Sequence, residues 1–205
     1  MRNLIFATSL TIVSLITSAF ITPLPNNENK PTLATYTIDK THSFINFKVN
    51  RFSMVDVVGR FNEFQGTVTF DANDFSKTQA EVTIHTNSVY SGFTARENAI
   101  KSPAFLDVKN HPEIKFKSKR AYEKGGKKFV VGDFTLHGVT KEIVLPIEMK
   151  GPFVDPTRSN TIAITSKITI NRQDFGMKFN RKLKNGKPFI GNEIDIELNI
   201  LALTK

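Results

Sequence analysis

The residues most able to do chemistry in this chain are its four histidines, His42, His85, His111 and His137. His42 is followed directly by Ser43, which could pair a hydroxyl nucleophile with a general base. His137 stands between two β-like runs in the stretch GDFTLHGVTKEIVLP. One hypothesis for the function is therefore a hydrolase that uses His42 or His137 with Ser43.

Each of these signals also has a simpler structural interpretation. A catalytic triad needs residues that meet in space, which the adjacency of His42 and Ser43 in the sequence does not provide. Asp39 and Ser43 are typical of turns and strand starts, where such side chains bond the local backbone. The stretch HGVTK indicates a tight strand connection in which Gly138 takes the unusual backbone angle. We therefore expect His137 to bond the backbone, and we predict no catalytic residue.

Metal and nucleic-acid sites are not indicated by the sequence. No histidine stands at a ligand spacing such as H-x-H or H-E-x-x-H, so no metal site is predicted, although a site assembled from distant strands would leave no such signature. In the basic stretch KFKSKRAYEKGGKK, Lys115 and Lys117 alternate with Phe116. Strands that stack bases display their aromatic residues outward together with their cations. This stretch therefore predicts a solvated strand face, and we expect no nucleic-acid partner.

A period of two dominates the chain from about residue 33 onward. In the clearest run, apolar Ile194, Ile196 and Leu198 alternate with acidic residues. About eight such runs occur, and one apolar face opposite one polar face is typical of antiparallel strands. Gly125-Gly126 and Asn185-Gly186 mark turns between them.

Helical signals are few. The segment 94–102 has Thr94 as a candidate N-cap with Glu97 three residues later, and it stops at Pro103. The segment 50–57, NRFSMVDV, is expected to form a turn or two of helix. One or two short helices cannot cover an open sheet, so the apolar strand faces must meet each other in a sandwich or a closed barrel. The predicted fold is all-β, an extended antiparallel barrel of about eight strands.

The N-terminal segment predicts export. Residues 1–19 combine a short basic start, an apolar run and the small residues Thr17-Ser18-Ala19, which is typical of a signal peptide cleaved after Ala19. An uncleaved membrane anchor is the alternative. Residues 20–33 are rich in Pro and Asn and are predicted to be a disordered linker, which leaves residues 34–205 as the folded domain. The chain has no cysteine, so an exported form depends on core packing alone.

Composition favours an apolar ligand. The chain has 18 Phe, 3 Tyr and no Trp, so most large side chains lack a polar group. In a barrel of about eight strands the inward face fills the lumen or lines a cavity for one ligand. The predicted lining residues are Phe47, Phe64, Val68, Ile84, Phe116, Phe134, Leu136, Ile164, Ile168, Ile194 and Ile196. The net charge of +9 leaves open a transient contact with an anionic membrane surface.

Six stretches in order carry a family resemblance: YTIDKTHSFINFKV, GRFNEFQGTVTFD, RENAIKSPAFLDVKNHPEIKFKS, GDFTLHGVTKEIVLP, NRQDFGM and IGNEIDIEL. Together they resemble successive blocks of the YceI family, from Tyr36 almost to the C-terminus. The resemblance implies a lipocalin-like barrel, exported to the bacterial periplasm, that holds a long isoprenoid or a similar amphipathic lipid. The chain departs from the family at Asn50-Arg51-Phe52 and in the longer, more basic loop 178–187, both of which affect the cavity mouth.

The expected function is a non-catalytic lipid carrier or store, without a cofactor other than a bound isoprenoid, quinone or fatty-acid-like lipid. An isoprenoid pyrophosphate would place its anionic head at the barrel mouth, where arginine binds such oxygens bidentately. Arg96 and Arg172 lie in the family-like stretches and lead, with Arg60 as a third candidate. Alternatively, Arg96 or Arg172 is a structural anchor that pairs with Asp107, Asp174 or a strand-end carbonyl. Two further alternatives are an interaction protein whose barrel only displays its loops, and a chain that forms a homodimer.

Overall fold

The computed structural model describes residues 33–157 and 159–204. The signal peptide predicted for residues 1–19 and nearly all of the linker predicted for residues 20–33 lie outside the described residues. Leu33, the last residue of that linker, is the first residue of a strand. Among the described residues, no helix combines the length and the apolar character needed to cross a lipid bilayer.

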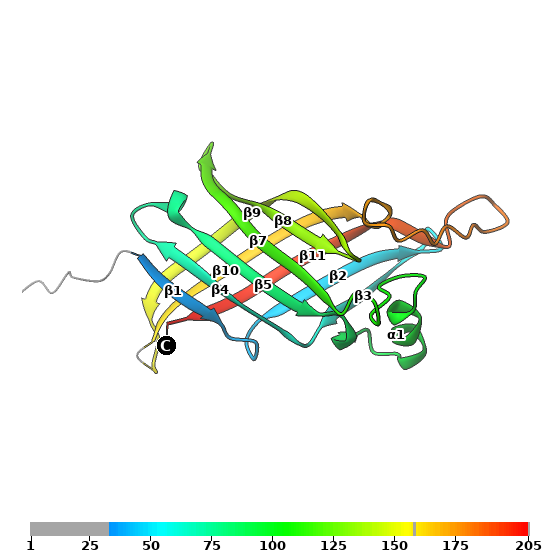
Figure 1. The fold of residues 1–205 in the computed structure, drawn as a ribbon, viewed down its shortest axis with the longest axis horizontal. Helices are drawn as coiled ribbons and strands as arrows, with labels where there is room; N and C mark the ends of the chain where they lie inside the picture. The colour runs from blue at the N-terminus through cyan, green and yellow to red at the C-terminus, as the bar shows by residue number, and fades with distance from the viewer. Residues whose placement is uncertain (1–32, 158, 205) are drawn as a thin grey trace, which may run out of the picture. The chain divides into compact units, whose positions relative to one another are not determined.

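Antiparallel strands make up most of the domain (Figure 1). The strands are β1 (Leu33–Ile38), β2 (Phe44–Arg51), β3 (Val55–Phe61), β4 (Phe64–Asp71), β5 (Gln79–His85), β6 (Val89–Tyr90), β7 (Glu113–Lys124), β8 (Lys127–Leu136), β9 (Val139–Val154), β10 (Asn160–Asn171) and β11 (Ile190–Leu203). The helical segments are α1 (Thr94–Lys101) and three single turns of 3₁₀ helix, η1 (Phe75–Lys77), η2 (Thr86–Ser88) and η3 (Arg172–Phe175).

The sheet closes into a barrel through its two outermost ring strands. Neighbouring strands follow the order β1-β4-β5-β7-β8-β9-β10-β11, and β1 pairs back with β11, with Thr37 opposite Leu203. Strands β2, β3 and β6 continue outward from β11. The prediction of an antiparallel barrel of about eight strands is confirmed by this closed ring of eight.

Strand register explains why the alternating residues share one interior. Along the β10–β11 ladder, Ile164 lies opposite Ile200 and Ile168 lies opposite Ile196. Because side chains alternate between the two faces of a strand, each of these pairs points to the same side as the next. The inward face of this ladder is therefore a band of branched apolar side chains, interrupted by the buried Ser166 opposite Leu198.

The predicted helix at residues 50–57 is wrong, because this segment is a hairpin. Arg51 pairs with Val55 across a turn in which Phe52 and Ser53 have positive φ angles of 61° and 54°. The side-chain amide of Asn50 donates to the carboxylate of Asp56 at 3.0 Å, which ties the two strands together. The cross-strand pairing outweighs the weak helical tendency of this short segment.

Helix α1 forms where the sequence predicts it, but its cap differs. Phe93, not Thr94, is the N-cap residue, and it makes no side-chain capping bond. The Glu97 carboxylate instead accepts from the backbone N–H groups of Ser91 (2.7 Å) and Phe93 (3.3 Å). These hydrogen bonds lower the pKa of Glu97, and the bond from the Ser91 N–H has the largest effect.

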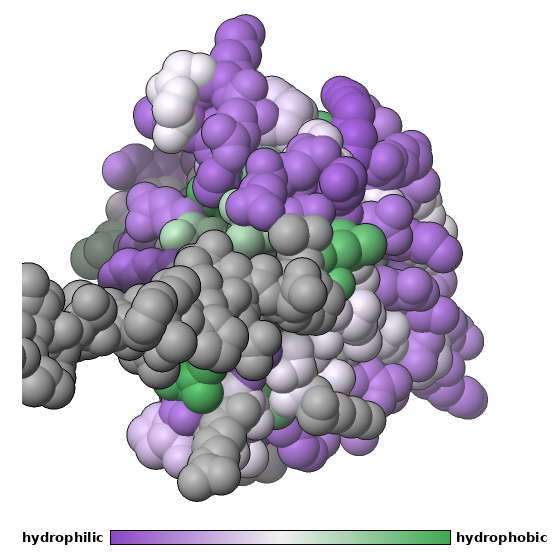
Figure 2. Space-filling view, turned by 90° about the vertical axis from the view of Figure 1, so that its left-hand side faces the viewer, coloured by the Kyte–Doolittle hydropathy of each residue, from purple (hydrophilic) through white to green (hydrophobic). Residues whose placement is uncertain are grey.

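The two ends of the barrel differ. The end at the left of Figure 1 shows a largely hydrophilic visible surface in Figure 2, with only small apolar areas. At the opposite end lie α1, the β2–β3 hairpin and the loop 176–189 that precedes β11 (Figure 1). This second end is called the α1 end. It carries the helix and the long loop, which lie outside the regular strand pairing of the barrel.

Candidate functional site

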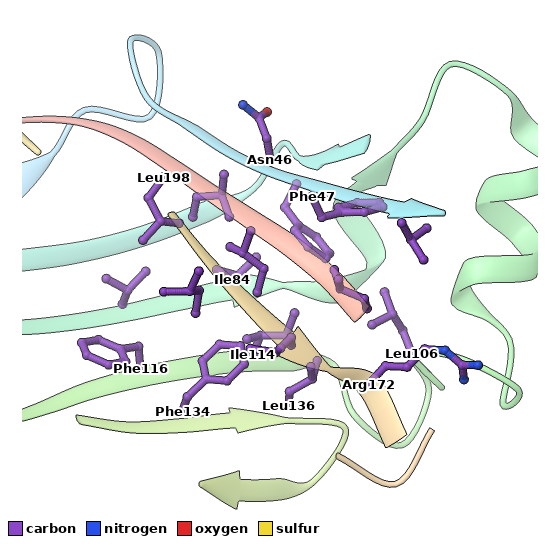
Figure 3. A pocket seen from close by; sticks show the side chains of 18 of the residues that line it. Asn46, Phe47, Ile84, Leu106, Ile114, Phe116, Phe134, Leu136, Arg172 and Leu198 are labelled. Carbon is purple, nitrogen blue, oxygen red and sulfur yellow. The ribbon is translucent and has the colours of Figure 1, made fainter. Parts of the chain in front are cut away.

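An apolar cavity of about 580 Å³ occupies the barrel interior. This volume falls within the usual range for small-molecule sites, roughly 300–1,000 Å³. In Figure 3, Ile84, Phe116 and Phe134 gather on the cavity, whereas Asn46 points away from them. The polar residues along the wall are Asn46, Arg51, Thr78, Arg96 and Arg172, and the others are aliphatic or aromatic. Such a wall favours a ligand that is mostly hydrocarbon.

Ten of the eleven predicted lining residues lie along this cavity. They are Phe47, Val68, Ile84, Phe116, Phe134, Leu136, Ile164, Ile168, Ile194 and Ile196. Phe64, which is buried at the first position of β4, does not line the cavity. The prediction that these residues contact a ligand stays a prediction.

A chain of four aromatic rings crosses the α1 end of the barrel. The ring of Phe52 contacts Phe189 with centroids 4.7 Å apart, Phe189 lies 6.3 Å from Phe179, and Phe179 lies 5.0 Å from Phe105. The chain links the β2–β3 hairpin, the loop 176–189 and the segment after α1. Phe105, Phe179 and Phe189 line the cavity. Sequence reasoning missed all four, because loop residues carry no period-two signal.

Arg51 is a cavity residue that the sequence did not single out as a binding group. Its guanidinium lies over the rings of Phe52 at 4.6 Å and Phe189 at 5.5 Å. Its Nε is buried and has no hydrogen-bond partner among the described residues. A buried donor without a partner costs free energy, so Arg51 offers a cation and an unused N–H at the cavity wall.

Of the three arginines predicted to bind the lipid head group, one lies on the cavity wall and another lies on the outer surface of the barrel. Arg96 lines the cavity, and its guanidinium donates to the hydroxyl of Ser91 (3.0 Å) and to its carbonyl oxygen (2.9 Å). Arg60 is exposed and lies over Tyr90 at 5.4 Å, on an outer groove separate from the cavity. Arg96 can therefore reach a ligand in the cavity, whereas Arg60 faces solvent.

Arg172 is 1% exposed and makes four hydrogen bonds to the protein. Its Nε donates to the carbonyl of Gly191 at 2.9 Å and its Nη1 to that of Met177 at 3.0 Å. Its Nη2 donates to the carbonyl of Phe179 at 2.5 Å and to the side-chain oxygen of Asn192 at 2.8 Å. Burial lowers its pKa, yet a guanidinium stays charged at neutral pH.

These bonds favour the structural-anchor interpretation of Arg172. The arginine ties η3, the loop 176–189 and the start of β11 together through carbonyl groups rather than through an acidic partner. In Figure 3 its guanidinium lies at the edge of the view, away from the apolar side chains. Asp174, one of the expected partners, instead faces Lys141 at 3.8 Å.

The histidines do not form a nucleophile–base pair with Ser43. His42 Nδ1 lies 2.6 Å from an Asp39 carboxylate oxygen. Hydrogen bonds from Thr41, then from His42, lower the pKa of Asp39 to about 2. The Ser43 hydroxyl donates to the Leu201 carbonyl at 3.2 Å and accepts from the Leu201 N–H at 2.9 Å, so it anchors β11.

His137 occupies the tight turn that the sequence predicts. It follows the last residue of β8 and precedes Gly138, with φ angles of 52° and 74° for the two residues. Its Nδ1 lies 3.1 Å from the carbonyl oxygen of Phe175, and this contact bears out the expected backbone bond. Strand β9 begins directly afterwards at Val139.

A closed antiparallel barrel around an apolar cavity defines a lipocalin-like ligand-binding fold. Residues 36–202 match the YceI-like domain, so the chain belongs to the YceI family. A UPF0312 protein of Vibrio parahaemolyticus is 32% identical over 210 residues, covering 100% of both chains. Another, of Pseudomonas savastanoi pv. phaseolicola, is 36% identical over 148 residues, covering 71% of this chain and 77% of the relative.

Solved structures share the fold at lower identity. BcnA of Burkholderia cenocepacia superposes with a TM-score of 0.70 at 20% identity, covering 80% of this chain and 98% of BcnA. A polyisoprenoid binding domain from Saccharophagus degradans gives a TM-score of 0.60 at 16% identity, covering 83% and 98%. These likenesses show that the chain shares the fold of both solved structures.

Replacing Arg172 should test its role as an anchor. Arg172→Gln leaves several buried acceptors unpaired, so we expect the free energy of unfolding to fall by about 3 kcal/mol or more. Arg51→Gln, at the cavity wall, should change it by less than about 1 kcal/mol. Urea denaturation followed by circular dichroism measures both. A normal midpoint for Arg172→Gln, with selective loss of binding to a pyrophosphate lipid, would contradict the anchor role.

Proposed function

We propose that this protein is an exported, non-catalytic carrier or store of one long-chain isoprenoid or similar amphipathic lipid, held in the barrel cavity. The observation that carries the proposal is the cavity of about 580 Å³ with aliphatic and aromatic walls. The relation to a polyisoprenoid binding domain supports an isoprenoid over other hydrocarbon chains. Quinones and fatty-acid-like lipids remain alternative ligands because they present the same apolar surface.

The apolar wall supports binding without any catalytic group. Burial of a methylene contributes about 0.8 kcal/mol, so ten buried carbons contribute roughly 8 kcal/mol before ordering costs. Micromolar affinity corresponds to about 8 kcal/mol. A longer chain, whose further buried carbons offset the ordering costs, therefore reaches this affinity through its hydrocarbon alone. The engaged Ser43 hydroxyl speaks against the hydrolase alternative.

The head group of the lipid would lie at the α1 end of the barrel. Among the cavity-lining arginines, Arg51 and Arg96 have the most N–H groups left for a ligand, because Arg96 bonds only Ser91 and Arg51 Nε has no partner among the described residues. A pyrophosphate there would gain charge-assisted hydrogen bonds. A neutral head group would forgo them but keep the hydrocarbon contacts. Arg51 replaces Arg172 as the leading candidate beside Arg96, and Arg60 remains the weakest of the three because it faces solvent.

Export to the periplasm rests on the N-terminal sequence. Residues 1–19 carry the features of a signal peptide. A periplasmic location suits a carrier, since a long isoprenoid has little solubility in an aqueous compartment and needs a shielded cavity.

Filling the cavity should abolish lipid binding. Ala80 on β5 lines the cavity, and its neighbour Gln79 is exposed on the opposite face of the strand. We expect Ala80→Phe to weaken binding of a radiolabelled polyprenyl alcohol at least about tenfold, because the new ring occupies the cavity. Gln79→Phe adds the same ring outside and should bind like the wild type.

Both variants should first be shown to fold by their melting curves. Equal binding by folded Ala80→Phe and Gln79→Phe would place the lipid elsewhere. Absence of binding by the wild-type protein would remove the proposal altogether.

We further propose that the α1 end docks on an anionic membrane to load and release the lipid. Loop 176–189 contains five cations and no acidic residue: Lys178, Arg181, Lys182, Lys184 and Lys187. None of the five forms an ion pair with a described residue. The neighbouring β2–β3 turn exposes Met54 (85%) and Val55 (55%), and Phe93 before α1 is 61% exposed.

This combination of exposed apolar tips and unpaired cations at the cavity mouth suits a bilayer with anionic head groups. A homodimer formed through Met54 and Val55 is the competing explanation for the same apolar residues. Binding to vesicles of different lipid charge distinguishes membrane docking from a homodimer, since dimer formation does not depend on lipid charge.

Charge removal at the α1 end should weaken membrane binding. Each cation near an anionic surface contributes about 1 kcal/mol, so Lys182→Gln with Lys184→Gln should reduce binding to phosphatidylglycerol vesicles by roughly 30-fold. The matched control is Lys124→Gln with Lys127→Gln in the β7–β8 hairpin. Co-sedimentation with phosphatidylglycerol and with phosphatidylcholine vesicles measures the effect. Equal losses from the two pairs would contradict a directed contact.

A further inference from the structure

Three side chains with metal-binding groups meet beside the barrel, outside the cavity. One carboxylate oxygen of Asp107 and one ring nitrogen each of His111 and His137 all lie within 4.8 Å of one another. Asp107 and His111 belong to the segment between α1 and β7, whereas His137 lies in the β8–β9 turn. No ligand spacing is visible in the sequence, because the third residue comes from a distant turn.

The local backbone sets Asp107 and His111 on the same side of their segment. The N–H of His111 donates to the carbonyl of Asp107 at 2.8 Å, so the two residues lie one tight turn apart. The side-chain amide of Asn110 donates to Asp107 Oδ2 at 2.8 Å and orients the carboxylate. The remaining oxygen, Oδ1, is left for another partner.

His137 presents a nitrogen with no partner. Its Nδ1 contacts the Phe175 carbonyl oxygen, which accepts only, so Nδ1 carries the proton and Nε2 has a free lone pair. Nε2 is buried without a hydrogen-bond partner among the described residues. A metal-bound histidine typically donates its other N–H to a carbonyl in this way. His137 is therefore oriented as a metal ligand would be.

The two imidazole rings are already packed together. Their centroids lie 4.5 Å apart. Gly138 permits this approach, because a Cβ atom at that position would lie 2.7 Å from His111 Cε1. Asp107 and His137 both hold positive φ angles, 46° and 52°. Such backbone strain in residues other than glycine persists only where the surroundings impose it.

We propose that Asp107, His111 and His137 form a binding site for a divalent transition-metal ion, with zinc as the best match. Two imidazoles and one carboxylate are ligands that zinc accepts, and three protein ligands leave a fourth position for water. Ligand atoms about 2.0–2.1 Å from a tetrahedral ion lie roughly 3.4 Å apart. The separations here are at most 4.8 Å, so small side-chain rotations close the site.

The site would connect two parts of the cavity wall. Leu106 and Leu136 both line the cavity and directly precede Asp107 and His137. A bound ion would therefore clamp the segment after α1 onto the barrel next to the cavity. This inference does not depend on which ligand the cavity holds.

Zinc titration of the untagged, chelator-treated full chain tests the proposal. Isothermal titration calorimetry with zinc chloride should detect one high-affinity ion per chain, and zinc should raise the melting temperature. His111→Gln and Asp107→Asn should each weaken binding at least about tenfold, since each removes one ligand. His85→Gln, at an exposed position on β5, is the matched control and should bind zinc like the wild type.

His137→Gln also loses the bond to Phe175, so its result counts only if its melting curve without zinc is normal. His111→Gln keeps the test decisive, because no side-chain hydrogen bond of His111 is lost within the described residues. Unchanged zinc affinity in His111→Gln, or absence of zinc binding by the wild type, would overturn the proposal.

Discussion

The pairing of β1 with β11 is the constraint on which the rest of the structure depends. Once Thr37 lies opposite Leu203, eight antiparallel strands form a ring, and every inward side chain faces a shared interior. Closure also removes the open edges that the ring strands would otherwise present. Because the inward residues are branched or aromatic and the ring has eight strands, their side chains line the interior without filling it. The cavity is thus a consequence of closure and alternation together.

The arginines of the cavity wall lie at the α1 end, where the regular pairing of the barrel strands stops. Arg172 holds that end by donating to the carbonyl oxygens of Gly191, Met177 and Phe179. The aromatic chain from Phe52 to Phe105 then covers the interior, and Arg51 lies among these rings. The same irregular segments therefore bring both aromatic rings and charge to the cavity mouth. This arrangement suits an amphipathic ligand better than a purely apolar one.

Period-two patterns predicted the barrel, and ten of the eleven residues that they predicted to line its interior lie along the cavity, because alternation reports directly which face of a strand is buried. The same reasoning failed for residues 50–57, where positive φ angles at Phe52 and Ser53 form a turn that composition does not reveal. It related Asn50-Arg51-Phe52 and loop 178–187 to the cavity mouth but assigned no binding role to Arg51, Phe179 or Phe189, which meet only through tertiary contacts. Phe64 has the same parity as Val68 but lies at the first position of β4 and is not part of the cavity wall. Local patterns therefore specify the walls, whereas the mouth depends on contacts between segments far apart in the sequence.

Native mass spectrometry of the protein, purified from its own cells without organic solvent, tests the central claim most directly. If the cavity carries a lipid, the spectrum should show the chain plus one apolar ligand, and organic extraction should return both the unliganded mass and a single lipid class. A spectrum with only the unliganded mass and an extract without lipid, for a protein with a normal melting curve, would contradict a lipid carrier or store.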